Sequence, residues 1–317
     1  MLSYMIRRLI YVMPVAIGVS VICFLLVQIA PGDPLTAIMP IDATAQEQAE
    51  MRAAYGLDKP LPVQYAIWIS NIAQGDMGKS IATGRPVAGE VFRAVKNSLL
   101  LALSAAAIAF PIGLFLGFLA GYFRDTMFDK VITAIAIAGV SIPNYWLGIV
   151  LVIIFSVTLG WLPSIGAGPG GSQEWQWNWA HIRHLILPAV TLAVVPIGIV
   201  ARTVRALVGD IFSTDFVEAL YAKGMTHFDV LRHVMRNAAA TALSVIGLQL
   251  GYLLGGSILI ETVFNWPGSG FLLSTAIFQR DLPLLQGAIL VLALFFVFAN
   301  VIVDVLQAAI DPRIKRT

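Results

Sequence analysis

The chain carries very little charge for its length. Only 12% of its 317 residues are charged, 58% are hydrophobic, and the mean hydropathy is +0.84. Because a soluble domain carries about 25% charged residues, this composition excludes an ordinary soluble protein and predicts a protein of the lipid bilayer. The formal net charge of +2 is too small to indicate a nucleic-acid partner.

Cysteine is nearly absent as well. Cys23 is the single cysteine, so an internal disulfide framework and a cysteine-rich metal site are both excluded. Cys23 lies inside the first apolar run and is interpreted as a packing residue.

The apolar runs lack ionisable residues in their interiors. A helix needs about 20 apolar residues to cross the hydrocarbon core, and six runs qualify, near 9–29, 98–122, 131–159, 185–208, 239–260 and 284–305. Glu261 and Asp304 lie at the ends of such runs. Ion-coupled carriers need polar or ionisable groups at depth, and the four histidines form no ligand pattern there. The sequence therefore predicts no metal or other cofactor bound by this chain.

The predicted fold is an all-α integral membrane protein with six transmembrane helices. Pro143 interrupts the third run after only 12 residues, 131–142, or about 18 Å of helix. One proline-kinked span is therefore favoured over two. We divide the chain into 1–97, the first transmembrane helix with a long external loop, and 98–317, a five-helix core with the internal loop 202–239.

Basic residues set the orientation. With six spans, one side holds Arg7, Arg8, Arg124, Lys130, Arg202, Arg205, Lys223, Arg232, Arg236, Arg313, Lys315 and Arg316, whereas the short loops of the other side hold Arg183 and Arg280. Lys and Arg accumulate on the cytoplasmic side, so both termini are predicted to be cytoplasmic.

The internal loop contains signals for two short helices. Asp215 and Glu218 have the spacing of a capping box, which predicts a helix that begins at Asp215. Gly224 can supply the positive φ that ends it, and Thr226 with Asp229 repeats the start signal for a helix to about residue 237. A partner protein or the chain's own helix ends must cover the apolar side chains of Phe216, Val217, Leu220, Phe228 and Leu231.

Glycine recurs at every fourth position in the second and fifth runs. Missing side chains let a neighbouring backbone approach closely, which is how membrane helices pack. The pattern predicts close packing within the chain or against a partner subunit at Gly113, Gly117, Gly121, Gly247, Gly251 and Gly255.

The two external loops carry weaker signals. The first favours short helices near 44–55 and 61–74, and its segment 75–80 imitates the end of a phosphate-binding loop without the first glycine or a preceding strand. In the second, Trp175, Trp177 and Trp179 are typical of an interfacial belt, with ligand stacking as the alternative.

Eight stretches together resemble the permeases of binding-protein-dependent ABC importers, in the dipeptide, oligopeptide and nickel group. They run over nearly the whole chain: Arg7-Arg8, Pro31-Gly-Asp-Pro34, Tyr55-Gly-Leu-Asp-Lys-Pro60, Gly75-Asp-Met-Gly78, Ser141-Ile-Pro-Asn144, Ala222-Lys-Gly224, Arg236-Asn237 and Glu261-Thr-Val-Phe-Asn-Trp-Pro-Gly-Ser-Gly270. The last block is the most specific, and its signature turn comprises Glu261, Thr262, Phe264, Trp266, Pro267, Gly268 and Gly270.

The internal loop resembles the segment by which such permeases grip their ATPases. The resemblance implies an ATPase-coupling loop of Asp215, Glu218, Ala219, Leu220, Ala222, Lys223, Gly224, Arg236 and Asn237. This chain departs from the family pattern after Val234, because Met235 and Arg236 stand where a leucine and a proline are expected.

The resemblance implies a type I ABC importer permease-like fold in a bacterial inner membrane. It further implies a second homologous permease subunit, two ABC ATPase subunits that hold ATP and Mg, and a periplasmic solute-binding protein. Such a permease is no enzyme itself and would move di- or oligopeptides by alternating access. Nickel or glutathione are the alternative cargoes, and a stand-alone channel or facilitator without partners is the alternative class.

Overall fold

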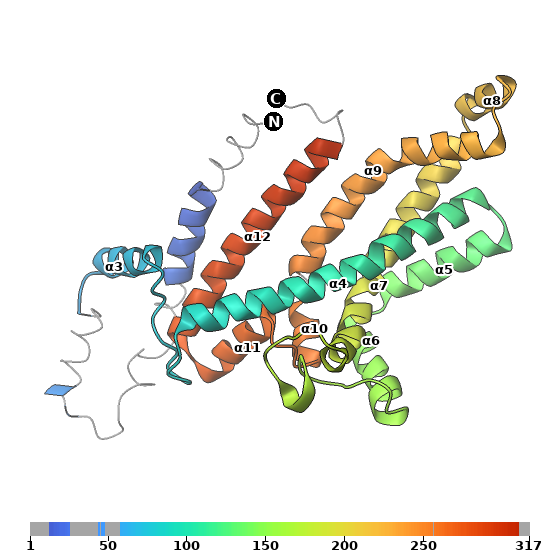
Figure 1. Cartoon of the computed structure of the whole chain (residues 1–317). Coiled ribbons are helices and arrows are strands. Elements are labelled where there is room, and N and C mark those ends of the chain that lie inside the picture. Colours follow the sequence, from blue (N-terminus) through green and yellow to red (C-terminus); the bar gives the residue numbers. More distant parts are fainter. Residues whose placement is uncertain (1–12, 26–43, 45, 48–57, 256, 311–317) are drawn as a thin grey trace. The chain divides into compact units, whose positions relative to one another are not determined.

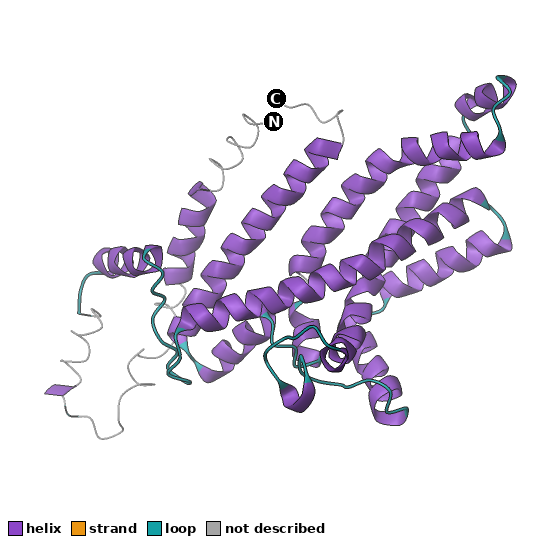
Figure 2. Ribbon diagram, in the orientation of Figure 1, coloured by secondary structure: helices purple, strands orange, loops and turns teal. Residues whose placement is uncertain are grey.

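The computed structural model describes residues 13–25, 44, 46–47, 58–255 and 257–310. Its secondary structure in these residues is helical apart from one isolated β-bridge between Lys79 and Pro86 (Figures 1 and 2). Besides the helix Met13–Leu25, the named helices are α3 (Leu61–Ala73), α4 (Val87–Tyr122), α5 (Met127–Ser141), α6 (Asn144–Leu151), the π-helix η2 (Val152–Thr158), the 3-10 helix η3 (Pro169–Gly171), α7 (Trp179–Phe212), α8 (Asp215–Ala222), α9 (His227–Gly255), α10 (Ile258–Val263), α11 (Ser269–Gln279) and α12 (Leu282–Ile310).

The chain forms two compact units. One is built from Ser98–Pro267 with the end of α12 from Ala299, and the other from the segments before Ser98 with Gly268–Phe298. One boundary between the units lies between Asn97 and Ser98. The second unit also takes in α11 and the first part of α12, which are distant in sequence from its other segments.

Three helices are long and apolar enough to cross a membrane: α4, α7 and the part of α12 from Leu282 to Ile302. Two bent pairs also qualify if each is one span, Met127–Ser141 with Asn144–Thr158 and His227–Ala239 with Thr241–Gly255. The described residues thus hold three to five candidate spans. Of the predicted first span, 9–29, they include only the apolar helix Met13–Leu25. Arg7-Arg8, the motif at 31–34 and most of the predicted helix 44–55 lie outside the described residues.

The third run is a broken helix rather than a kinked one. α5 ends at Ser141, Ile142 is extended with φ −78° and ψ 128°, and the helix from Asn144 runs at 101° to α5. A proline disfavours the helical conformation of the residue before it, and here Ile142 leaves the helix completely. The interruption lies at Pro143 as predicted, but the helix breaks there where a kink was expected.

Helix α7 lies at the centre of the larger unit. It contributes to two buried clusters, one with α4 and α10 and one with α8 and α9. The first cluster includes Leu101, Leu192, Leu253, Ile260, Phe264 and Trp266, and the second includes Val200, Val204, Val208, Val217, Leu220, Val230 and Val234.

The glycines of α4 lie against α7 of the same chain. A β-carbon at Gly117 would lie 2.5 Å from the carbonyl oxygen of Ala201, and one at Gly121 would lie 2.7 Å from that of Arg205. At Gly113 the nearest atom is the β-carbon of Val200, at 3.0 Å. The two backbones approach too closely for any side chain, as packing of membrane helices through small residues requires. In the glycine series of α9, a β-carbon at Gly251 would lie 3.3 Å from the side-chain oxygen of Asn300 in α12.

Candidate functional site

The internal loop folds as the two-turn helix α8 between the long helices α7 and α9 (Figure 1). It begins at Asp215 as predicted, but the capping box is absent. The cap residue is Thr214, which makes no side-chain cap bond and donates its hydroxyl to the carbonyl oxygen of Ile211 at 2.6 Å. Asp215 is thus the first helical residue. With Glu218 it places two carboxylates in the first turn, where the helix dipole favours negative charge.

The end of α8 is a Schellman motif. The amide of Gly224 donates to the carbonyl oxygen of Tyr221 at 2.9 Å, and the amide of Met225 donates to that of Leu220 at 3.2 Å. This pair of bonds needs a left-handed residue after the helix, and Gly224 has φ +77°. A β-carbon there would meet nothing within 4 Å. The glycine is therefore required by the backbone angle and not by lack of space.

Helix α9 begins at the second predicted signal. The hydroxyl of Thr226 donates to the carboxylate of Asp229 at 2.6 Å and accepts from its amide at 3.3 Å. The helix does not end near residue 237, however. It continues to Gly255, with a bend of 43° between Ala239 and Thr241.

The apolar side chains of the loop divide between two faces. Val217 and Leu220 are buried against Val230 and Val234 of α9 and residues of α7. Phe228, by contrast, is 76% exposed. The chain's own helices therefore cover Val217 and Leu220, while cover of Phe228 by a partner stays a prediction. Also exposed are Asp215, Phe216, Glu218, Ala219, Tyr221, Ala222, Lys223, Arg236 and Asn237.

A histidine bridge connects α8 to its neighbours, and no pattern in the sequence predicts it. Hydrogen bonds join the two ring nitrogens of His227 to the hydroxyl of Tyr122 at 2.9 Å and to that of Tyr221 at 2.6 Å. The bridge therefore connects the last residue of α4, helix α8 and the first residue of α9.

The signature turn closes α10 with a second Schellman motif. Asn265 has φ +44° and its amide donates to Thr262, while the amide of Trp266 donates to the carbonyl oxygen of Glu261 at 2.8 Å. Glu261 is fully buried, and its carboxylate accepts hydrogen bonds from Ser257 at 2.8 Å and from Ser98 at 2.5 Å. Glu261 is thus buried just beyond the end of α9, and two hydroxyl donors bond its carboxyl group.

The second external loop packs on this turn. The amide of Gly166 donates to the carbonyl oxygen of Phe264 at 2.9 Å, and the rings of Trp175 and Trp266 lie 5.8 Å apart. Trp177 and Trp179 are exposed, at 81% and 67%. Of the three tryptophans proposed as a belt, Trp175 therefore belongs to the packing around the turn. Pro267 follows the turn, and Gly268 and Gly270 stand at the start of α11.

The segment that imitates a phosphate loop is a structural turn. Gly75 and Gly78 have positive φ, and the carboxylate of Asp76 accepts from the amide of Gly78 at 2.8 Å. Ser80 is buried and donates to Asp281 at 2.5 Å. Among the residues that the structure describes, no three His, Cys, Asp or Glu side chains gather as possible metal ligands.

Two family models together match nearly the entire chain. The model described as binding-protein-dependent transport system inner membrane component matches residues 113–316, and the model of the N-terminal part of such components matches residues 1–112.

Two curated relatives and one solved structure are similar to this chain. Glutathione transport system permease protein GsiC of Escherichia coli (strain K12) is 41% identical, and a putative peptide transport system permease protein of Brucella abortus is 39% identical. Both alignments cover 99% of each chain. An inward-facing conformation of the MetNI methionine ABC transporter matches with a TM-score of 0.57 over 70% of this chain and 96% of the other. The identity of 20% limits that likeness to the fold.

Proposed function

This chain belongs to the family of binding-protein-dependent transport system inner membrane components, and we propose that it imports di- and oligopeptides with a second permease subunit. As a member it is a multi-pass permease of the inner membrane and does not catalyse a reaction itself. Permeases of this family function with ATPase and binding-protein partners. A stand-alone channel is therefore set aside.

Helix α8 is our candidate for the contact with the ATPase subunits. The observation that carries this assignment is its division into an anchored and an exposed face. Val217 and Leu220 fix it to α7 and α9, whereas Phe216 and Glu218 remain exposed. A helix fixed in this way moves together with the spans on either side of it. Closure of two ATPases on ATP would then shift the spans between inward- and outward-open states, which is alternating access.

The cargo proposal is supported by both relatives. One relative is named for glutathione, itself a tripeptide, and the other for peptides.

Deletion of this permease should prevent growth when a peptide is the only source of a required amino acid. The physical reason is that the apolar runs carry no ionisable residue in their interiors, so a pathway between them would not select peptides by the charge of their side chains. Growth of the mutant and wild type is compared on trialanine, on glutathione and on the free amino acids as control. Normal growth on trialanine with loss on glutathione alone would favour the glutathione cargo. Normal growth on both with a collapse of nickel-dependent enzyme activity would favour nickel.

Cysteines placed on the two soluble sides should react with an impermeant thiol reagent only from their own side. In a Cys23→Ser background, Ala82→Cys lies in the first external loop and Lys223→Cys follows α8; both positions are exposed. The basic-residue distribution predicts labelling of Ala82→Cys in intact spheroplasts and of Lys223→Cys only after permeabilisation. External labelling of Lys223→Cys would contradict the cytoplasmic position of α8.

A further inference from the structure

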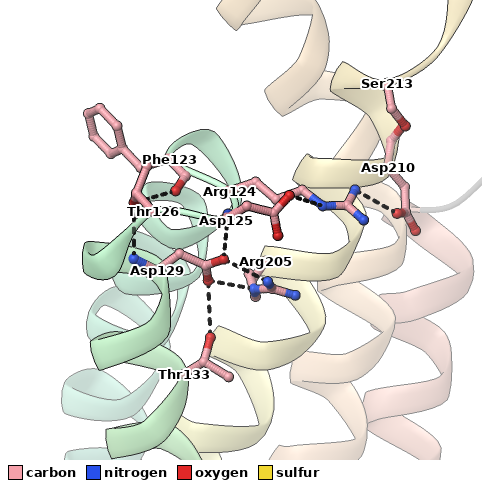
Figure 3. Close-up of polar contacts among 9 residues, drawn as sticks. All are labelled: Phe123, Arg124, Asp125, Thr126, Asp129, Thr133, Arg205, Asp210 and Ser213. Carbon is pink, nitrogen blue, oxygen red and sulfur yellow. Dashed lines mark hydrogen bonds and ion pairs between the residues drawn. The ribbon is translucent and has the colours of Figure 1, made fainter.

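A buried carboxylate at the start of α5 is held by an arginine of α7 (Figure 3). Asp129 is only 1% exposed. Arg205 donates two hydrogen bonds to the carboxylate of Asp129, from Nε to Oδ1 and from Nη2 to Oδ2, each at 2.6 Å. Two parallel bonds from a guanidinium to a carboxylate are the strongest and most directional ion pair available to side chains.

The remaining acceptor sites of Asp129 are also filled. The backbone amide of Asp125 donates to Oδ2 at 2.9 Å, and the hydroxyl of Thr133 donates to Oδ1 at 3.1 Å. Asp125 has φ +66°, so the α4–α5 turn itself is shaped to present its amide. Asp129 is buried, whereas the side chain of Arg205 is 30% exposed. Loss of the arginine would therefore leave a buried carboxylate without its counter-charge, which is costly.

A second ion pair beside it is of a different kind. Arg124 lies 3.4 Å from Asp210, and both side chains are largely exposed (Figure 3). Water screens such a pair, and exposed pairs contribute little. The two pairs therefore form a natural comparison within one region.

Close backbone packing continues the contact between α5 and α7. A β-carbon at Gly198 would lie 2.6 Å from the carbonyl oxygen of Ala136, and one at Gly139 would lie 3.0 Å from the Cγ1 of Val194. Backbones this close resist tilting toward each other, so sliding along the shared face is the motion that an ion pair between the helices would have to prevent. α7 ends at Phe212 and α8 starts at Asp215. Only Ser213 and Thr214 separate the two helices, so a displacement of α8 acts directly on the end of α7.

We propose that the Asp129–Arg205 pair joins α5 and α7 into one rigid lever, which carries the displacement of α8 into both helices. The proposal rests on the function proposed for α8. Arg205 is a positioning residue in this scheme: it touches neither cargo nor ATPase and acts through α5. Without the pair, α7 could follow α8 while α5 stays behind, and ATP hydrolysis would proceed without moving the pathway.

Charge exchange tests the pair. The complete complex with its ATPases and binding protein is placed in liposomes. The measured quantity is the ratio of peptide molecules imported, either trialanine or glutathione, to ATP molecules hydrolysed. Arg205→Asp and Asp129→Arg should each lower this ratio about tenfold, within the range typical for coupling between two sites. The double variant with both exchanges should restore most of the wild-type ratio. Arg205→Lys should give an intermediate ratio, because lysine keeps the charge but cannot make the two parallel hydrogen bonds of the guanidinium. Arg124→Ala is the matched control and should keep the wild-type ratio.

A disulfide between the two helices tests rigidity independently, even where a single variant fails to assemble. The approach at Gly139 and Val194 places their β-carbons within about 4.5 Å, the distance that a disulfide spans. In a Cys23→Ser background, Gly139→Cys with Val194→Cys should import equally well oxidised and reduced. Import that stops on oxidation and returns on reduction would overturn the lever, as would a wild-type ratio in both single charge variants. A wild-type complex without ATP-driven import of either peptide would instead reject the proposed function.

Discussion

Gly224→Val should abolish ATP-driven import while the protein reaches the membrane in normal amounts. Gly224 has φ +77°, which costs a residue with a β-carbon about 1–2 kcal/mol, and more if the side chain is branched. The Schellman bonds from Gly224 and Met225 should then be lost, so that α8 ends in a different direction. The spans should survive, because a side chain at Gly224 meets no other atoms within 4 Å.

Two variants separate backbone strain from loss of the coupling contact. Gly224→Asn should retain import, since asparagine adopts the left-handed conformation more easily than valine. Gly84→Val is the matched control, because Gly84 has φ +69° and the same open surroundings in the first external loop. It carries a similar strain away from α8 and should import normally.

Glu218→Lys tests the exposed face of α8 directly. It replaces a carboxylate by an ammonium in the first helical turn, where the helix dipole disfavours positive charge, and it reverses the charge offered to a partner. Binding of the ATPases is measured by co-purification and import in liposomes. If Gly224→Val and Glu218→Lys both retain bound ATPases and wild-type import, α8 is not the coupling element.

Gly117→Leu should leave little folded protein in the membrane. A β-carbon at Gly117 would lie 2.5 Å from the carbonyl oxygen of Ala201 and 2.8 Å from the β-carbon of Val204. The backbone oxygen cannot rotate away, so α4 and α7 must separate. Overpacking of this kind typically costs about 1–3 kcal/mol and occasionally more, and here it also opens the buried cluster around Val200 and Val204, against which Leu114 and Phe118 of α4 pack.

Gly89→Leu provides the control on the same helix. A side chain at Gly89 meets nothing within 4 Å, and leucine favours a helix over glycine. The amount of protein in the membrane and its thermal midpoint in detergent should stay at wild-type values for Gly89→Leu and fall for Gly117→Leu. An equally stable Gly117→Leu protein would contradict the close approach of α4 to α7.

The sequence by itself determined the features that arise from neighbouring residues. Composition predicted a membrane protein, and the family models place it among inner membrane components. The start of α8 at Asp215, its end before Gly224 and the start of α9 after Thr226 were predicted from capping chemistry and are confirmed. These features depend on backbone angles and on bonds within one or two turns, which local sequence specifies.

Local rules also misled in two places. They assigned the cap of α8 to Asp215, whereas Thr214 occupies it, because two adjacent residues both suit a helix start. They favoured a kinked span at Pro143, whereas the helix breaks there. A proline permits both outcomes, and the packing around the following segment selects one.

Only the tertiary structure decided which residues meet across the fold. The glycine period in α4 was visible, but not that it lies against Ala201 of α7. Arg205 pairs with Asp129 76 positions earlier, and Ser98 bonds Glu261 across 163 positions. In the sequence Arg205 is one more basic residue of the internal side, and Glu261 marks the end of a run. Burial and directional hydrogen bonds turn them into specific pairs, and those depend on how the helices pack rather than on any spacing along the chain.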